Sequence, residues 1–390
     1  MTAPAPRICH LADIHLGYRR YNRLARGGFN QREVDVSAAF REAIDRVIDL
    51  KPAATLIAGD LFHSVRPSNA VLAFAFREIR RLVRRSGAPV VILAGNHESP
   101  KRIDTGSALR LLGEIEGCHV ADGRAERFSF PERDLSVLCL PHGALSRLGD
   151  TEVRADDAFR YNVLALHGQL SGGWVSEFGG EPFELGRLSP HEWNYIALGH
   201  VHVFRTVALN AAYSGAIEHT TVNLWSEAHE GKGFLEVDLG SGQPRFHRLT
   251  TPREVAVMPP IDALELEPHE IMERIRGAVA EVPGGIEGKL VRLEISNISR
   301  PVFRQLDHRE LRRLRSLALN LTLDVHTVEG AGVPVEVPAP GRLVRRAPLA
   351  EDLHRFCVER LSGHLEGVAI GEVLGSYLKK LEEEDEAPQA

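Results

Sequence analysis

The sequence has 390 residues, of which 43% are hydrophobic and 26% charged, and its formal net charge is −6. This composition is ordinary for a globular protein, and the length predicts at least two domains. The negative balance argues against a protein that coats nucleic acid by charge alone. No apolar run approaches the roughly 20 residues that a membrane span needs, so we expect no membrane association.

The N-terminal residues and the cysteines indicate the compartment. Residues 1–6 lack a basic segment followed by an apolar one, so we predict no secretory signal peptide. The cysteines are Cys9, Cys118, Cys139 and Cys357, which are scattered and show no CxxC spacing. We therefore expect free, buried thiols in a cytoplasmic protein.

In the N-terminal part of the chain, predicted strands and helices alternate. Apolar runs predict strands at 7–12, 54–58 and 89–94, and apolar residues at helical spacing predict helices at 40–50 and 68–85. Such alternation is typical of a largely parallel sheet covered by helices. Residues 18–33 are polar and are expected to form a loop.

After a short helix expected at 104–112, the pattern becomes richer in strands. These are predicted at 127–130, 136–140, 162–166 and 195–198, with shorter runs around 212–215 and 233–237. They are expected to complete a second sheet. The predicted fold class is therefore α/β, a β-sandwich flanked by helices, followed by a smaller α+β unit.

A proline-containing stretch at 250–262 predicts a domain boundary. We assign residues 1–250 to the first domain and 260–330 to the α+β domain. The latter is expected to contain helices at 267–281 and 307–318 and strands at 289–296 and 320–327. Residues 350–382 are expected to form a C-terminal helical segment, whose apolar stripes would pack on the chain's own core or dock on a partner.

Side chains of metal-ligand types follow the predicted strands at their carboxyl ends. They are Asp13, His15, Asp60, Asn96, His167, His200 and His202. Each motif alone is equally compatible with a turn or a surface group. Because parallel strands end at one edge of a sheet, we expect these side chains to lie together. Two ions about 3.5–4 Å apart would clamp a phosphate and activate a water, and we expect the two oxygens of Asp60 to bridge them.

The motifs DIH, GDLFH, GNHES, ALHG and GHVH, in this order, resemble the calcineurin-like metallophosphoesterases from residue 7 to about residue 240. The extension GDLFHSVRPS at 59–68 is similar to the SbcD-type DNA repair exonucleases and their archaeal and eukaryotic counterparts. The segments YSGAIE at 213–218 and KGF at 232–234 also resemble that subfamily, although Ala216 replaces its usual Ser.

The resemblance implies a role for each of these residues. One ion would be held by Asp13, His15 and His202, the second by Asn96, His167 and His200, and Asp60 would bridge the two. His97 would stabilise the scissile phosphate or protonate the leaving oxygen, and His63 would orient the nucleic-acid backbone. Glu98 is expected to support the site by hydrogen bonding. Arg66 would contact a phosphate, unless it belongs to a solvated helix face.

The predicted function is a DNA exo- or endonuclease, with two divalent ions, expected to be Mn²⁺, that hydrolyses phosphodiester bonds in double-strand-break repair or end processing. A phosphodiesterase for cyclic nucleotides or nucleotide sugars and a scaffold that bridges DNA and an ATPase remain as alternatives. The resemblance implies DNA and an SbcC-type coiled-coil ATPase as partners, with pairing into a homodimer, and a capping role for residues 260–330. The chain has no GxxxxGK motif followed by Ser or Thr, so ATP-driven work would need that partner.

Overall fold

The computed structural model describes residues 5–99, 106–145, 153–171 and 181–328. The helical segment expected at 350–382 and Cys357 lie outside these residues. Cys9, Cys118 and Cys139 are buried free thiols, as predicted. Within the described ranges, no helix has both the length and the apolar composition that crossing a membrane requires.

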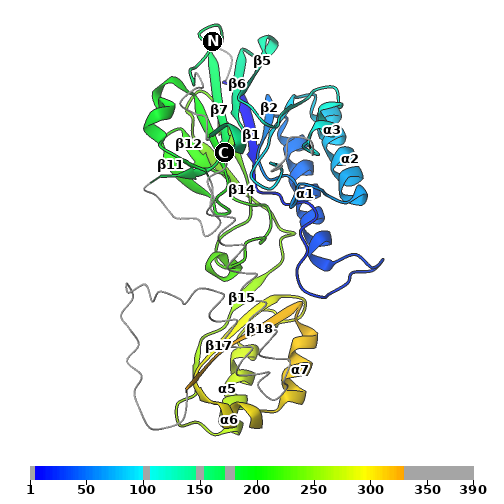
Figure 1. Ribbon diagram of the computed structural model, residues 1–390, viewed down its shortest axis with the longest axis vertical. Coiled ribbons are helices and arrows are strands. Elements are labelled where there is room, and N and C mark those ends of the chain that lie inside the picture. The colour runs from blue at the N-terminus through cyan, green and yellow to red at the C-terminus, as the bar shows by residue number, and fades with distance from the viewer. Residues whose placement is uncertain (1–4, 100–105, 146–152, 172–180, 329–390) are drawn as a thin grey trace, which may run out of the picture. The chain divides into compact units, whose positions relative to one another are not determined.

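Two six-stranded sheets form the part of the chain before residue 250 (Figure 1). The first sheet has the order β14 (Pro244–Arg248), β13 (Gly233–Asp238), β1 (Arg7–Leu11), β2 (Ala54–Ala58), β3 (Val90–Leu93) and β4 (Cys118–Ala121). The second has the order β11 (Arg205–Ala208), β12 (Ala211–Tyr213), β10 (Tyr195–Gly199), β7 (Tyr161–His167), β6 (Leu135–Leu140) and β5 (Glu126–Phe130). Strands β1 to β4 are mutually parallel, and so are β6, β7, β10 and β12. The carboxyl ends of the central strands of each sheet therefore share an edge.

Buried side chains of both sheets pack face to face in one apolar cluster. It includes Leu56 and Val91 of the first sheet and Val163 and Ala197 of the second. Helices α1 (Gln31–Leu50) and α2 (Asn69–Ser86) cover the outer face of the first sheet, where they share a second cluster with β1, β2 and β3 (Figure 1). The predicted α/β sandwich flanked by helices is confirmed.

Helix α1 begins well before the predicted start at residue 40, so the prediction of a loop through residue 33 is wrong. The helix starts at Gln31, and the side chain of Asn30 caps it by accepting a hydrogen bond from the N–H of Arg32. Arg32 is fully buried and pairs with Asp35 and Glu218. Because these charged residues occupy the buried face, the first turns of the helix lack the apolar spacing by which helices are recognised.

The helix expected at 104–112 is shorter and lies further along the chain. Helix α3 covers only Arg110–Gly113, and residues 104 and 105 lie outside the described residues. Gly106 has a φ of 62°, in the left-handed region that a helix cannot continue through. Short elements that were not predicted include α4 (His142–Leu145), β8 (Gln169–Leu170) and β9 (Pro182–Phe183).

Residues 255–328 build a separate, entirely parallel sheet around its own apolar cluster. Its strands are β15 (Val255–Val257), β16 (Ile261–Asp262), β17 (Leu290–Ser299) and β18 (Asn320–Val328), and its helices are α5 (Pro268–Ala280), α6 (Arg300–Gln305) and α7 (His308–Leu317). Elements α5, β17, α7 and β18 stand where the sequence predicts them, whereas the short β15, β16 and α6 were not predicted. The capping role of this unit stays a prediction.

Candidate metal centre

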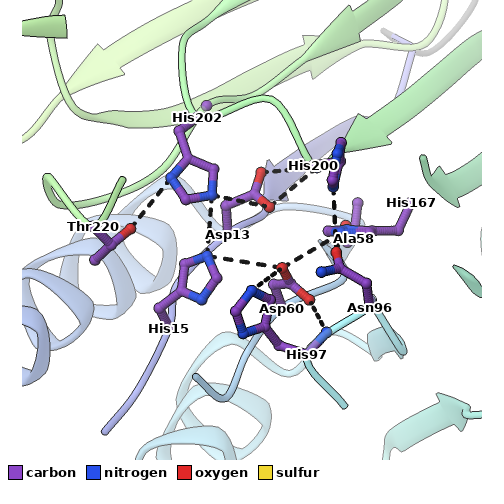
Figure 2. Close-up of polar contacts among 12 residues, drawn as sticks. Asp13, His15, Ala58, Asp60, Asn96, His97, His167, His200, His202 and Thr220 are labelled. Atoms are coloured by element: carbon purple, nitrogen blue, oxygen red, sulfur yellow. Dashed lines mark hydrogen bonds and ion pairs between the residues drawn. The ribbon is translucent and has the colours of Figure 1, made fainter. Parts of the chain in front are cut away.

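Seven side chains from both sheets meet at the shared edge (Figure 2). Asp13 and His15 follow β1, Asp60 follows β2, Asn96 follows β3, His167 ends β7, and His200 and His202 follow β10. These are the seven candidate ligands named from the sequence, and the structure brings all of them together.

Glycines allow the two sheets to come this close. A Cβ on Gly199 would lie 1.8 Å from the carbonyl oxygen of Ala58, and a Cβ on Gly59 would lie 2.2 Å from Nδ1 of His167. Neither position has room for a side chain. The approach of β2 to β7 and β10 therefore depends on glycine at both positions.

The backbone at this edge is strained. Four residues, Asp13, His15, Asp60 and His200, have φ values of 53°, 56°, 53° and 106°. Residues other than glycine rarely adopt such positive φ values. Backbone hydrogen bonds hold two of them, from Asp13 N to Gly59 O at 3.1 Å and from His15 N to Asp60 O at 2.9 Å. Such strain is typical of functional sites, where the surrounding structure enforces a particular direction of the side chains.

The ligating atoms fall into two groups. In the first, Nε2 of His15 lies 3.1 Å from Nε2 of His202, which lies 3.9 Å from Oδ1 of Asp13. In the second, Oδ1 of Asn96 lies 3.0 Å from Nε2 of His167 and 3.3 Å from Nδ1 of His200. These distances fit the two ligand sets that the resemblance implies, which stay a prediction.

Asp60 lies between the two groups. Its Oδ2 is 3.8 Å from Nε2 of His15 and 3.5 Å from Nε2 of His167, whereas its Oδ1 accepts a hydrogen bond from the N–H of His97 at 3.0 Å. This geometry differs from our expectation that the two oxygens of Asp60 bridge two ions. A single oxygen, Oδ2, faces both groups, and Oδ1 is used to hold the carboxylate in place.

The second ring nitrogen of three histidines has a partner of its own. Nδ1 of His167 donates to the carbonyl oxygen of Ala58 at 2.9 Å, and Nδ1 of His202 lies 3.3 Å from Oγ1 of Thr220. Nδ1 of His15 lies 3.4 Å from Nδ1 of His63. A hydrogen on Nδ1 leaves the lone pair on Nε2, the nitrogen that faces the other ligands.

Burial and the charge of Asp60 set the protonation of the site. Burial lowers the pKa of His15 to about 3 and that of His200 to about 4, so both rings are neutral at neutral pH. Burial also lowers the pKa of His167, but the Asp60 carboxylate outweighs it and raises that pKa to about 9. The carboxylate of Asp60 therefore favours a positive charge between itself and His167. Either a proton on His167 or a bound metal cation would supply that charge.

Glu98 joins the loops that carry Asp60 and Asn96. It is buried, and its carboxylate accepts hydrogen bonds from the backbone N–H groups of Asp60 at 3.1 Å, Phe62 at 2.6 Å and Gly95 at 2.9 Å. This is the supporting contact expected of Glu98.

A cavity of about 380 Å³ opens in front of the ligands. His63 and His97 both line it, with their rings stacked at a centroid distance of 5.2 Å. Nδ1 of His97 donates to the carbonyl oxygen of His63 at 2.8 Å, and its Nε2 lies 3.9 Å from Oδ2 of Asp60. Arg66 is exposed and is not among the described residues that line the cavity.

Sequence reasoning missed five residues that line this cavity, which are Tyr18, Arg20, Thr220, Thr221 and Val222. Tyr18 and Arg20 lie in the predicted loop, where nothing distinguishes them from other polar-loop residues, and Thr220 lies in a stretch without predicted structure. For Thr220 a signal was present, because it follows the YSGAIE segment by two residues. The contact of Thr220 with a ligand histidine became visible only in three dimensions.

The donor set suits a divalent metal. Neutral imidazoles, a carboxylate and an amide oxygen are ligands for manganese, iron or zinc. In His200 the nitrogen that faces the second group is Nδ1, which lies 3.3 Å from Oδ1 of Asn96. Two groups that share one carboxylate oxygen could hold two ions at the floor of the cavity.

Comparison with known protein families and proteins indicates what this chain is similar to. The Calcineurin-like phosphoesterase family matches residues 6–204. The chain is 31% identical over 237 residues to the DNA double-strand break repair protein Mre11 of Methanocaldococcus jannaschii, covering 59% of this chain and 61% of the relative. It is 26% identical over 246 residues to the Mre11 of Methanococcus maripaludis, covering 60% and 63%. With the Mre11 of Thermoplasma acidophilum it is 26% identical over 324 residues, covering 75% and 81%.

In the first two of these matches the chain spans less than two thirds of the relative's length, 61% and 63%. The family match, in contrast, covers half of the chain and includes all seven side chains from Asp13 to His202. The chain belongs to the calcineurin-like phosphoesterase family.

Proposed function

We propose that this protein is a metal-dependent DNA nuclease that hydrolyses phosphodiester bonds in double-strand-break repair or end processing. The observation that carries the proposal is the position of Asp60, whose Oδ2 lies 3.8 Å from His15 and 3.5 Å from His167 at the floor of an open cavity. A carboxylate oxygen between two ligand groups suits a pair of ions that act together on one phosphate.

The two groups of candidate ligands support an assignment of residues to two ions. One divalent ion would be held by Asp13, His15 and His202, the other by Asn96, His167 and His200, with Oδ2 of Asp60 between them. The mixture of imidazole and hard oxygen donors leads us to propose Mn²⁺. The chemistry that such a pair of ions would supply is polarisation of a phosphoryl oxygen and a lowered pKa of a water.

The contacts of His97 support a role for its ring at the leaving oxygen. Its Nδ1 donates to the His63 carbonyl, so Nε2 is the nitrogen that takes up and releases a proton. That nitrogen lies 3.9 Å from Oδ2 of Asp60. We propose that protonated His97 stabilises the scissile phosphate and donates its proton to the leaving oxygen.

His63 keeps His97 in this position. The carbonyl of His63 accepts the His97 hydrogen bond, and the ring of His63 packs between His97 and Tyr18, with a centroid distance of 5.0 Å to Tyr18. The His63 side chain also lines the cavity, where it could contact a phosphate of the backbone. We propose both roles for His63.

DNA is proposed as the substrate because three relatives are described as DNA double-strand break repair proteins. We further propose DNA-end selection by residues 260–330, pairing into a homodimer, and assembly with an SbcC-type coiled-coil ATPase. Size-exclusion chromatography of the chain, alone and mixed with such an ATPase, tests the last two. Elution of the chain as a monomer in both runs, separate from the ATPase in the second, would contradict the homodimer and the assembly with the ATPase.

Cleavage assays test the nuclease directly. Purified protein with Mn²⁺ is offered end-labelled duplex, hairpin and single-stranded DNA and, in parallel, cyclic nucleotides. We expect DNA cleavage that EDTA abolishes and excess Mn²⁺ restores. Hydrolysis of cyclic nucleotides without DNA cleavage would favour the small-molecule phosphodiesterase instead. Protein that binds two ions and cleaves neither substrate would contradict both enzymes and favour the scaffold.

A further inference from the structure

Two sequence segments that the proposed mechanism leaves unused converge on His202. Lys232, from the KGF segment, is buried and donates from Nζ to the carbonyl oxygen of His202 at 2.8 Å. Its charge is paired with Glu227 at 2.5 Å. The N–H of Ala216, from the YSGAIE segment, donates to the same carbonyl at 3.1 Å. The backbone of one candidate ligand is therefore held by two remote parts of the chain.

The side chain of His202 is held as well. Oγ1 of Thr220 lies 3.3 Å from its Nδ1, on the side of the ring away from the other ligands (Figure 2). Nε2 of His202 faces His15 and Asp13, so it must carry the lone pair if a cation is to bind there. The hydrogen then stands on Nδ1, and the hydroxyl oxygen of Thr220 accepts it. Without that acceptor, a buried N–H loses its partner and the ring is free to rotate.

The loop that carries Thr220 is anchored by a buried ion pair. Glu218 and Arg32 are both fully buried, and Nη2 of Arg32 donates to Oε1 of Glu218 at 3.0 Å and to the carbonyl oxygen of His219 at 2.7 Å. Arg32 also pairs with Asp35 on helix α1. Removing Arg32 would leave the buried carboxylate of Glu218 without its charge partner, so the pair helps to fix the position of the loop.

We infer that Thr220, held in place by the Arg32–Glu218 pair, is a positioning residue for His202 and thereby sets the affinity of the ion that Asp13, His15 and His202 would hold. This inference rests on the metal centre of the proposed function, and it does not depend on DNA being the substrate. It gives the YSGAIE and KGF segments a common purpose, which is to hold one ligand of the first ion from its backbone and from its ring.

Calorimetric titration of metal-free protein with Mn²⁺ tests the inference. The Thr220→Val variant keeps the shape of the side chain and removes the acceptor. We expect one of two binding events to weaken by about 10- to 100-fold, the usual effect of removing a partner of a ligand histidine, while the other is unchanged. Thr220→Ser restores the oxygen and is expected to bind both ions with wild-type affinity.

Thr221→Val is the matched control. Thr221 is equally buried in the same loop, but its hydroxyl has no hydrogen-bond partner among the described residues. We expect this variant to bind both ions as the wild type does, and every metal-free variant to unfold cooperatively, as a folded protein does. Should Thr220→Val fail to fold, the comparison of Thr220→Ala with Thr220→Ser replaces it.

Three results would overturn the inference. They are wild-type affinity for both ions in Thr220→Val, an equal loss of affinity in Thr221→Val, and failure of the wild type to bind Mn²⁺, which would also overturn the metal centre. Wild-type protein that binds two ions and cleaves no DNA would contradict the nuclease proposal alone. In that event the affinity ratio between Thr220→Val and Thr220→Ser still decides the role of Thr220.

Discussion

The carboxylate of Glu98 accepts a hydrogen bond from the backbone N–H of Asp60 at 3.1 Å. It also accepts hydrogen bonds from the N–H groups of Phe62 and Gly95, so it links the loop after β2 to the loop after β3. Asp60 has a φ of 53° and needs such support, because this backbone conformation is unfavourable for a residue with a side chain. The direction in which Oδ2 of Asp60 points is therefore determined by a residue that touches neither ligand group.

We expect Glu98→Gln to destabilise the metal-free protein by about 2 kcal/mol. An amide offers one acceptor oxygen, so at least one of the three buried N–H groups loses its partner, at a cost of about 1–3 kcal/mol. Urea unfolding in EDTA measures the change. Glu116→Gln, at an exposed glutamate, is the control and should stay within about 0.5 kcal/mol of wild type. Equal stabilities of the two variants would contradict this role of Glu98.

Asp60→Asn should weaken the binding of both ions. The substitution removes the negative charge that lies 3.8 Å from His15 and 3.5 Å from His167. Asn96→Ala should weaken only one ion, because Oδ1 of Asn96 contacts His167 and His200 and lies in a single group. Titration of each metal-free variant with Mn²⁺ separates the two cases. If Asp60→Asn loses one binding event and keeps the other at full strength, Oδ2 does not bridge.

His97→Ala should abolish cleavage without releasing the ions. We expect DNA cleavage to fall by about 100- to 10,000-fold, the usual contribution of a general acid. The variant should still bind two Mn²⁺, because His97 belongs to neither ligand group and contacts Asp60 through its own N–H and ring. His191→Ala, at an exposed histidine, is the control. Loss of one ion in His97→Ala would instead make His97 a ligand.

The stability of the metal-free protein should depend on pH through His10, which lies in the core. Its Nδ1 is 2.9 Å from the hydroxyl of Tyr195, and burial lowers its pKa from 6.5 to about 3. Between these values the unfolded chain binds the extra proton, so stability rises with pH. The contribution of His10 is complete above about pH 6.5 and is lost as the pH falls toward 3, with about 2 kcal/mol lost between pH 7 and pH 5.

Urea unfolding of wild type and His10→Gln at both pH values measures this contribution. The glutamine can still reach the Tyr195 hydroxyl but does not titrate, so its stability should fall less than that of wild type on acidification, by about 2 kcal/mol. An identical pH dependence in the two proteins would show that His10 is protonated in the folded state or that it titrates alike in both states.

Much of the site could be read from the sequence because its residues occur at strand ends. An apolar run of four to seven residues followed by Asp, Asn or His is visible without coordinates, and parallel strands bring such ends to one edge. Strands β1, β2, β3, β7 and β10 were predicted on this basis. Helix α1 was predicted too short because its buried face begins with charged residues, Arg32 and Asp35, and not with apolar ones. The spacing of apolar residues cannot reveal an ion pair between Arg32 and the distant Glu218.

The sequence by itself determined the fold class, the family resemblance and the seven candidate ligands, because each depends on local patterns of apolar and polar residues. Tertiary structure decided how the side chains of those candidate ligands are arranged. Only the packing of one sheet against the other places a single oxygen of Asp60 between His15 and His167. The neighbouring loops after β1 and β2 bring Nδ1 of His15 to His63, and Arg66 is not among the residues that line the cavity. Likewise Thr220 reaches His202 through a loop set by a buried ion pair. Contacts between side chains far apart in the chain depend on backbone direction and on charge neutralisation in the interior, which residue types and spacing do not encode locally.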